Sequence, residues 1–190
     1  MIKITEKNVY LPKYNNNVYV YITTPVNDNR VISLTENDED LIHEVIINQM
    51  VNNLNKCIEA YESSPLPDCF IDQQSFIITN NIPKDIYGSY MLNGDIYFNP
   101  NVLSDLYHIS NKFIFGHEMA HKIQKFRNVE EFYTLIRSIY GTDNELFLKE
   151  VFSDICGTLV SNKMEIKRYP MDEGIYNNLK QKALKCIYRG

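Results

Sequence analysis

The chain contains no run of the roughly 18 apolar residues that a membrane-spanning helix requires. It also lacks the long apolar core of a secretory signal peptide near its start, because Lys3, Glu6 and Lys7 interrupt the sequence there. We therefore expect no membrane partner and a cytoplasmic location. A secreted protein whose leader had been removed would begin in the same way.

The sequence also lacks clusters of basic residues. Lys and Arg are scattered among acids, and the formal net charge is −5. Nucleic-acid binding needs a clustered basic face, which excludes nucleic acid as the main partner. A chain of 190 residues can bury a core without disulfides or oligomerisation, and no repeat or linker divides it. We expect one domain over residues 1–190 and a monomer.

Cysteine is scarce and widely spaced. The four cysteines form no Cys-x-x-Cys pair, so we expect free thiols: Cys57, Cys69, Cys156 and Cys186. Cys57 and Cys156 lie on apolar helical stripes, which favours a place in the core. A nucleophilic cysteine is not supported, because the two histidines best placed to activate one belong to a different motif.

Histidine is scarce as well, yet two of the four histidines stand four positions apart in FGHEMAHK, residues 115–122. On an α-helix, His117 and His121 then share one face about 6 Å apart, and both reach one metal ion. Glu118 projects from the next position, where a carboxylate serves as a general base beside zinc. Apolar neighbours indicate a buried helix. A chance match on an ordinary helix has a probability on the order of one percent.

A zinc site needs a third protein ligand, and EVFSDICGTLV, residues 150–160, offers one. This segment is typical of a helix that carries Glu150 and Asp154 one turn apart on the same face. We assign Glu150 as the ligand and Asp154 as the acceptor for the outer N–H of a ligating imidazole, with His117 as the expected partner. Three competing acids lie near predicted helix starts, where acids are common: Glu130, Glu131 and Glu145.

The two motifs, HExxH at 117–121 and ExxSD at 150–154, together resemble those of the gluzincin metallopeptidases, the clan that includes thermolysin. The resemblance implies one catalytic Zn²⁺ and a compact single-domain α+β fold of the zincin-like kind. In such a fold a small mixed sheet packs against the active-site helix and the third-ligand helix. By resemblance, the zinc ligands are His117, His121 and Glu150, the base that activates water is Glu118, and the carboxylate behind the ligands is Asp154.

A second resemblance concerns residues 88–100, which look like the strand that precedes the HExxH helix in compact gluzincins and in the ImmA/IrrE family. There the strand is a sheet edge that pairs with an extended peptide substrate. Asn93-Gly94 separates two β-prone runs, which predicts a hairpin. The resemblance places a peptide substrate along residues 95–99, from Asp95 to Asn99. A plain structural hairpin is the equal alternative.

The sequence indicates the group that would stabilise the oxyanion less clearly than it indicates the general base, Glu118. In the implied mechanism Glu118 takes a proton from water and returns it to the leaving amine. Tyr140, ten residues before Glu150, stands where several gluzincins carry a tyrosine, and we name it as a candidate donor, with packing as the alternative. Tyr169 and Tyr176 are weaker candidates. Only residue type recommends two further histidines: His108 is better explained as a surface or capping residue and His43 as a residue on a helix face.

Three functions are compatible with these motifs. The first is a zinc-dependent endopeptidase that acts on extended peptide. The second is an intracellular regulatory protease of the ImmA/IrrE type, which cleaves a transcriptional repressor by the same chemistry. The third is a non-catalytic zinc-binding module. Structural zinc sites usually have four Cys or His ligands, and the three ligands with Glu118 here favour the first two functions.

The periodicity of apolar residues predicts the remaining elements. Strand-like alternation or β-prone runs occur at 18–23, 30–34 and 75–79. Helical spacing predicts helices at 38–62, 102–108, 111–126, 129–140, 144–164 and 172–188.

Overall fold

The computed structural model of the protein describes residues 2–25, 36–83, 85–104, 110–166 and 168–189. These residues form two compact units. The sheet unit consists of Met1–Lys56 and Asp72–Tyr107, and the helical unit of Cys57–Ile71 and His108–Gly190. These two units do not decide the prediction of one domain over residues 1–190, which stays a prediction. The chain crosses between them three times, which explains why no single linker is visible in the sequence.

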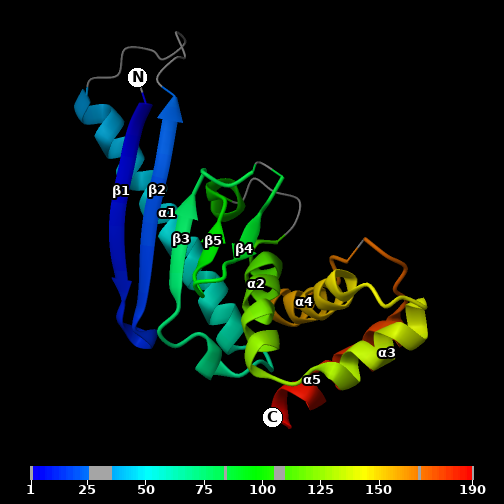
Figure 1. The fold of residues 1–190 in the computed structure, drawn as a ribbon. Helices are drawn as coiled ribbons and strands as arrows, with labels where there is room; N and C mark the ends of the chain where they lie inside the picture. Colours follow the sequence, from blue (N-terminus) through cyan, green and yellow to red (C-terminus); the bar gives the residue numbers. More distant parts are fainter. Residues whose placement is uncertain (1, 26–35, 84, 105–109, 167, 190) are drawn as a thin grey trace. The chain divides into compact units, whose positions relative to one another are not determined.

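A five-stranded mixed sheet dominates the sheet unit, with strand order β1-β2-β3-β5-β4 (Figure 1). β2 pairs in parallel with β3, and β3 with β5, whereas the pairs β1–β2 and β4–β5 are antiparallel. The parallel pairing of β2 with β3 requires a crossover, which α1 (Glu36–Glu62) provides. The strands are β1 (Ile2–Leu11), β2 (Asn16–Pro25), β3 (Ser75–Thr79), β4 (Gly88–Tyr90) and β5 (Ile96–Phe98), with short 3₁₀ helices η1 (Pro12–Tyr14) and η3 (Pro100–Ser104).

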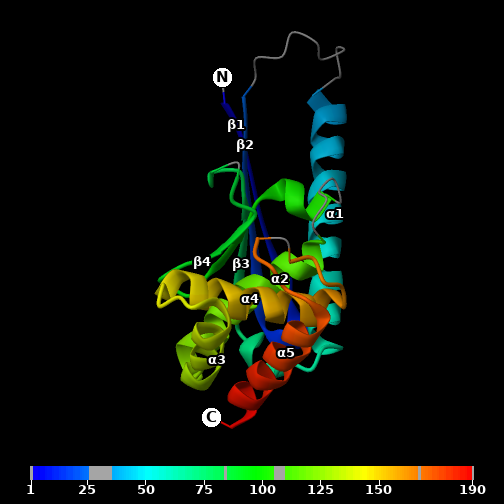
Figure 2. The ribbon, with the colours of Figure 1, turned by 90° about the vertical axis from the view of Figure 1, so that its right-hand side faces the viewer.

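Buried side chains alternate along the inner strands. Phe76 and Ile78 of β3, like Ile96 and Phe98 of β5, are buried, while the residues between them are half-buried. This period of two is typical of a strand with one face in the core. The part of α1 that belongs to the sheet unit runs along one face of the sheet (Figure 2). Its buried residues recur at helical spacing: Ile47, Met50, Val51 and Leu54.

The predicted hairpin at Asn93-Gly94 is present as the β4–β5 pair. The backbone N–H of Met91 donates to the carbonyl of Asp95 at 2.9 Å, and Gly94 has a φ of 93°, which favours glycine. The hairpin leaves β4, not β5, at the margin of the sheet, because β5 pairs with β3 on its other side. Residues 95–99 therefore offer no free strand edge, and the predicted pairing of a substrate with them is corrected.

Four helices and the end of α1 form the helical unit. α2 packs along α4, and α5 contacts both α3 and α4. The side chain of Asn144 caps α4 by accepting the N–H of Phe147 at 3.0 Å. The helices are α2 (Asn111–Phe126), α3 (Glu130–Tyr140), α4 (Glu145–Ser161) and α5 (Glu173–Tyr188), with the 3₁₀ helix η2 (Asp68–Phe70).

Two glycines allow α2 and α4 to approach closely. A Cβ at Gly116 would lie 2.7 Å from Cγ2 of Val160, and a Cβ at Gly157 would lie 2.7 Å from the backbone oxygen of Phe113. Such short contacts do not occur without displacement of the neighbour, so each position requires a residue without a side chain. This approach sets the HExxH segment of α2 beside the ExxSD segment of α4.

The α+β class and the mixed sheet are confirmed. α2 and β3 begin and end where the sequence predicts, and α1, α3, α4 and α5 agree to within one turn. The sequence analysis does not predict β1. The predicted strand at 30–34 and residues 105–108 of the predicted helix at 102–108 lie outside the described residues. Packing of the sheet against α2 and α4 would join the two units and stays a prediction.

Two predictions that concern the whole chain can be compared with the described residues. None of the helices in these ranges is long and apolar enough to cross a membrane. The four cysteines are free thiols, and Cys57 and Cys156 are buried as expected. Burial raises the pKa of the Cys156 thiol well above its usual value, which disfavours the nucleophilic thiolate.

Candidate metal centre

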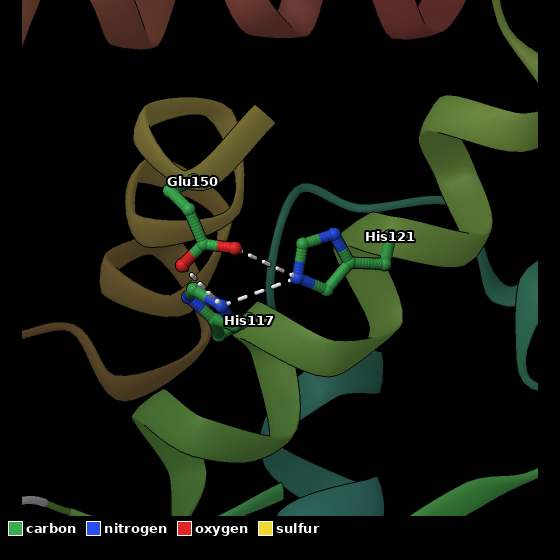
Figure 3. A group of neighbouring side chains, drawn as sticks. All are labelled: His117, His121 and Glu150. Carbon is green, nitrogen blue, oxygen red and sulfur yellow. Dashed lines mark hydrogen bonds and ion pairs between the residues drawn. The ribbon is translucent and has the colours of Figure 1, made fainter. Parts of the chain in front are cut away.

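Three side chains from two helices of the helical unit converge on one point (Figure 3). His117 and His121 lie one turn apart on α2, and the carboxylate of Glu150 on α4 faces both rings. The Nε2 atoms of the two histidines are 3.3 Å apart. Oε2 of Glu150 lies 3.5 Å from Nε2 of His117, and Oε1 lies 3.6 Å from Nε2 of His121. The structure thus brings together the three residues that the sequence predicts as ligands.

These separations fit one small metal ion. Zinc binds imidazole nitrogen and carboxylate oxygen at about 2.0–2.1 Å, so two ligand atoms of a tetrahedral site lie about 3.4 Å apart. The two Nε2 atoms are 3.3 Å apart, and each lies 3.5 or 3.6 Å from a different oxygen of Glu150, so these separations are close to this value. Within the described part of the chain, no fourth His, Cys, Asp or Glu joins the group. The donor set therefore suits a metal with an open coordination position.

Asp154 fixes the orientation of His117. Oδ1 of Asp154 lies 2.9 Å from Nδ1 of His117, and Asp154 is only 1% exposed. When Nδ1–H donates to this carboxylate, Nε2 keeps its lone pair and faces the other two ligands. This is the contact that the sequence predicts for Asp154.

Ser153 is the corresponding partner of His121. Its Oγ lies 3.3 Å from Nδ1 and 3.5 Å from Nε2 of His121. The same Oγ accepts a hydrogen bond from Nε2 of Gln124 at 3.3 Å. A Nδ1–H donor on His121 would again leave Nε2 for the metal. The sequence analysis gives Ser153 no role, although its place three positions after Glu150 puts it on the same face of α4.

The pKa values of the two imidazoles shift in opposite directions. Burial lowers the pKa of His117, but the hydrogen bond to Asp154 and the charge of Glu118 outweigh it, and the pKa lies above 6.5. Burial and the positive charge of His117 lower the pKa of His121 to about 4. His121 is therefore neutral at neutral pH, whereas His117 must lose a proton to bind a metal from its charged form.

Glu118 lies in the buried part of α2. The helix is buried from Phe113 to Ala120, as the apolar neighbours of the motif predict. Glu118 itself is 6% exposed and precedes His121 by three positions on α2. The carboxylate is therefore largely shielded from solvent.

Two residues beyond α4 reach the site. Nη1 of Arg168 donates to Oε2 of Glu150 at 2.8 Å, and Nη2 donates to Oδ1 of Asp154 at 2.8 Å. The hydroxyl of Tyr169 donates to Oδ2 of Asp154 at 2.9 Å. The sequence analysis does not identify Arg168, because it follows the third-ligand helix in an irregular segment with no periodic pattern. It considers Tyr169 only as an oxyanion donor, whereas the structure shows it supporting Asp154.

Tyr140 makes contacts that match the packing alternative. Its hydroxyl donates to the backbone oxygen of Pro170 at 2.8 Å. Its ring packs edge-on against Phe147 and Tyr169, with centroids 5.5 and 5.8 Å away. These contacts direct the hydroxyl to the backbone and include none of the three candidate ligands. Of the weaker candidates, Tyr176 is half-buried on α5, and the side chains of His43 and His108 lie outside the described residues.

The acids that compete with Glu150 in the sequence have partners elsewhere. Glu145 pairs with Lys149 at 2.6 Å, and Glu131 pairs with Lys182 at 2.7 Å. Glu130 accepts a hydrogen bond from Arg137. The geometry therefore selects Glu150 among the four acids.

Comparison with known proteins adds no relative. No protein-family model, curated protein or solved structure matches the chain. The resemblance to gluzincins therefore depends on the two sequence motifs alone.

Proposed function

We propose that the protein is a zinc-dependent endopeptidase of the gluzincin type, in which His117, His121 and Glu150 hold one Zn²⁺. The observation that carries the proposal is the convergence of two Nε2 atoms 3.3 Å apart and one carboxylate, whose two oxygens lie 3.5 Å from His117 and 3.6 Å from His121. Neutral imidazole nitrogen and carboxylate oxygen are ligands that zinc prefers, and three protein ligands are typical of catalytic zinc.

The chemistry that we propose combines this centre with the neighbouring base. Bound Zn²⁺ would polarise a substrate carbonyl and lower the pKa of a coordinated water to about 7. The carboxylate of Glu118 accepts a proton from the attacking water, whose oxygen forms a bond to the carbonyl carbon. Glu118 then gives the proton to the amide nitrogen as the C–N bond breaks, and a carboxylic acid and an amine leave.

The other residues of the site orient the ligands rather than react. Asp154 holds the outer nitrogen of His117, which leaves Nε2 of that ring for the metal, and the Oγ of Ser153 lies beside the ring of His121. His117 and Glu118 are both buried, which limits the access of water to the site. We infer an extended peptide as the substrate, because hydrolysis at such a centre requires a carbonyl exposed to the metal and to Glu118.

A digest of a peptide library, analysed by mass spectrometry, tests the proposed function. The zinc-loaded protein should cleave internal peptide bonds, and a chelator should stop cleavage. Glu118→Gln is the matched control, since it keeps the size of the side chain and the three ligands but cannot accept the proton. Its turnover should fall by about 10² to 10⁴ with zinc content unchanged.

Two results would contradict the proposal. Full zinc occupancy without cleavage of any library peptide would indicate a non-catalytic zinc-binding module. Equal activity of Glu118→Gln and the wild type would remove Glu118 from the mechanism.

A further inference from the structure

The guanidinium of Arg168 bridges two acidic side chains of α4, one a candidate metal ligand and the other a partner of His117. Its two terminal nitrogens each donate at 2.8 Å, one to the candidate ligand Glu150 and one to Asp154, which orients His117. The two acids are four positions apart on one helical face, where like charges repel. A planar guanidinium presents parallel N–H groups and can span such a pair, which a point-charge ammonium cannot.

These contacts close a ring of side chains around the site. Starting at His117, the ring passes through Asp154 at 2.9 Å, Arg168 at 2.8 Å and Glu150 at 2.8 Å, and returns to His117 at 3.5 Å. Two candidate metal ligands from different helices are therefore connected through Arg168 and Asp154. Arg168 binds Oε2 of Glu150, so we assign Oε1, which lies 3.6 Å from Nε2 of His121, to the metal.

An aromatic cluster holds the segment that carries Arg168. The ring of Tyr169 packs edge-on against Phe147 and Tyr140, with centroids 5.4 and 5.8 Å away. The hydroxyl of Tyr140 binds the backbone oxygen of Pro170 at 2.8 Å, and the hydroxyl of Tyr169 binds Asp154 at 2.9 Å. The side chain of Arg168 is 55% exposed, but the two residues that follow it, Tyr169 and Pro170, contact side chains of α3 and α4.

The charges of the site give Arg168 a further role. Three carboxylates, those of Glu118, Glu150 and Asp154, lie on the two helices that form the site. A divalent cation offsets two of these charges, and Arg168 supplies the third positive charge. Before a metal binds, the same guanidinium reduces the repulsion between Glu150 and Asp154.

We propose that Arg168 is a positioning residue of the metal centre, which holds the Glu150 carboxylate in register with His117 so that both donors meet the ion. The proposal depends on the proposed zinc site but not on peptidase activity. Arg168 acts through Glu150 and Asp154 and touches neither substrate nor metal.

Zinc affinity, measured by competition with a chelator, tests this role. Arg168→Ala should weaken zinc binding by about 10- to 100-fold, as loss of an outer-shell partner does in other metal sites. Arg168→Lys should recover only part of the affinity, because an ammonium spans the two carboxylates poorly. Low, non-denaturing concentrations of guanidinium ion should partly restore zinc binding to Arg168→Ala. A purely structural defect would not respond in this way.

Arg189→Ala is the matched control. Its side chain is 57% exposed and pairs with a carboxylate, Glu131, at 3.5 Å, but it lies outside the ring around the metal. Its zinc affinity should equal that of the wild type.

The outcomes separate the two proposals. If the wild type binds no zinc, the metal centre itself is refuted. A second outcome overturns only the role of Arg168. In it the wild type binds zinc, Glu150→Gln does not, and Arg168→Ala binds zinc as tightly as the wild type. Should Arg168→Ala fail to fold, Arg168→Lys decides: wild-type zinc affinity in that variant would contradict the bridging geometry.

Discussion

Glu150 is the ligand that the sequence places least securely, because it lies 29 positions after His121. Replacing it by Gln should release zinc, since a neutral amide is a far weaker ligand than a carboxylate. Glu145→Gln is the control on the same helix, because Glu145 is exposed and pairs with Lys149. Metal analysis of the purified variants should show zinc in Glu145→Gln and its loss in Glu150→Gln. The reverse pattern would show that the third ligand is misassigned.

The pKa of His117 predicts how zinc affinity depends on pH. This pKa is raised above 6.5 in the metal-free protein by Asp154 and Glu118, against the effect of burial. Zinc must therefore displace a proton at any pH below the raised pKa, and affinity should fall by about tenfold per pH unit as pH decreases through that range.

Asp154→Asn tests the cause of this pH dependence. The amide removes the negative charge and so lowers the pKa of His117, which should move the loss of zinc affinity to lower pH. Titration by isothermal calorimetry at several pH values measures both curves. Coincident pH profiles for the wild type and the variant would exclude Asp154 as the source of the raised pKa.

The ligands themselves could be predicted at the residue scale because helical geometry is local. The spacing of His117 and His121, and of Glu150 and Asp154, fixes which side chains share a face. Arg168 could not be predicted, because its contacts depend on how the chain turns after α4 ends. For Tyr140, the position in the sequence suggested a role at the metal centre. Its hydroxyl instead donates to the backbone oxygen of Pro170, a contact that the sequence does not predict.

At the scale of elements, the close approach of α2 and α4 sets the distance between the ligands. Gly157→Ala should destabilise the protein by about 1–3 kcal/mol, because the new Cβ overpacks the contact with Phe113, although Ala favours a helix by about 1 kcal/mol over Gly. It should also weaken zinc binding by moving Glu150 away from α2. Denaturant unfolding and chelator competition measure the two effects. An increase in stability would mean that the helices are not in close contact there.

The helices and strands with the clearest pattern of apolar residues were the easiest to predict from the sequence. α2 is buried at every position from Phe113 to Ala120, and it begins and ends where the sequence predicts. β1 is missing from the prediction, because it pairs only with β2 in the described sheet and its sequence mixes charged and apolar residues. The inner position of β5 was not predictable either, since strand order depends on pairings between distant segments rather than on local pattern.

For the whole molecule, the division into two units predicts which part of the chain a bound metal stabilises. All three candidate ligands belong to the helical unit, so zinc should stabilise that unit. At about a thousandfold excess of free zinc over Kd, the gain is about 4 kcal/mol, which corresponds to a Tm increase on the order of 10 °C for a chain of this size. Differential scanning calorimetry should show the shift in the wild type and none in His121→Ala. An equal shift in His121→Ala would place the bound zinc elsewhere.

Anomalous diffraction at the zinc absorption edge, on crystals grown with one equivalent of zinc, tests the central claim most directly. We predict a single anomalous peak at about 2.0–2.1 Å from Nε2 of His117, Nε2 of His121 and a carboxylate oxygen of Glu150. A peak on other residues, or no peak at these three under saturating zinc, would contradict the metal centre and the function proposed for it.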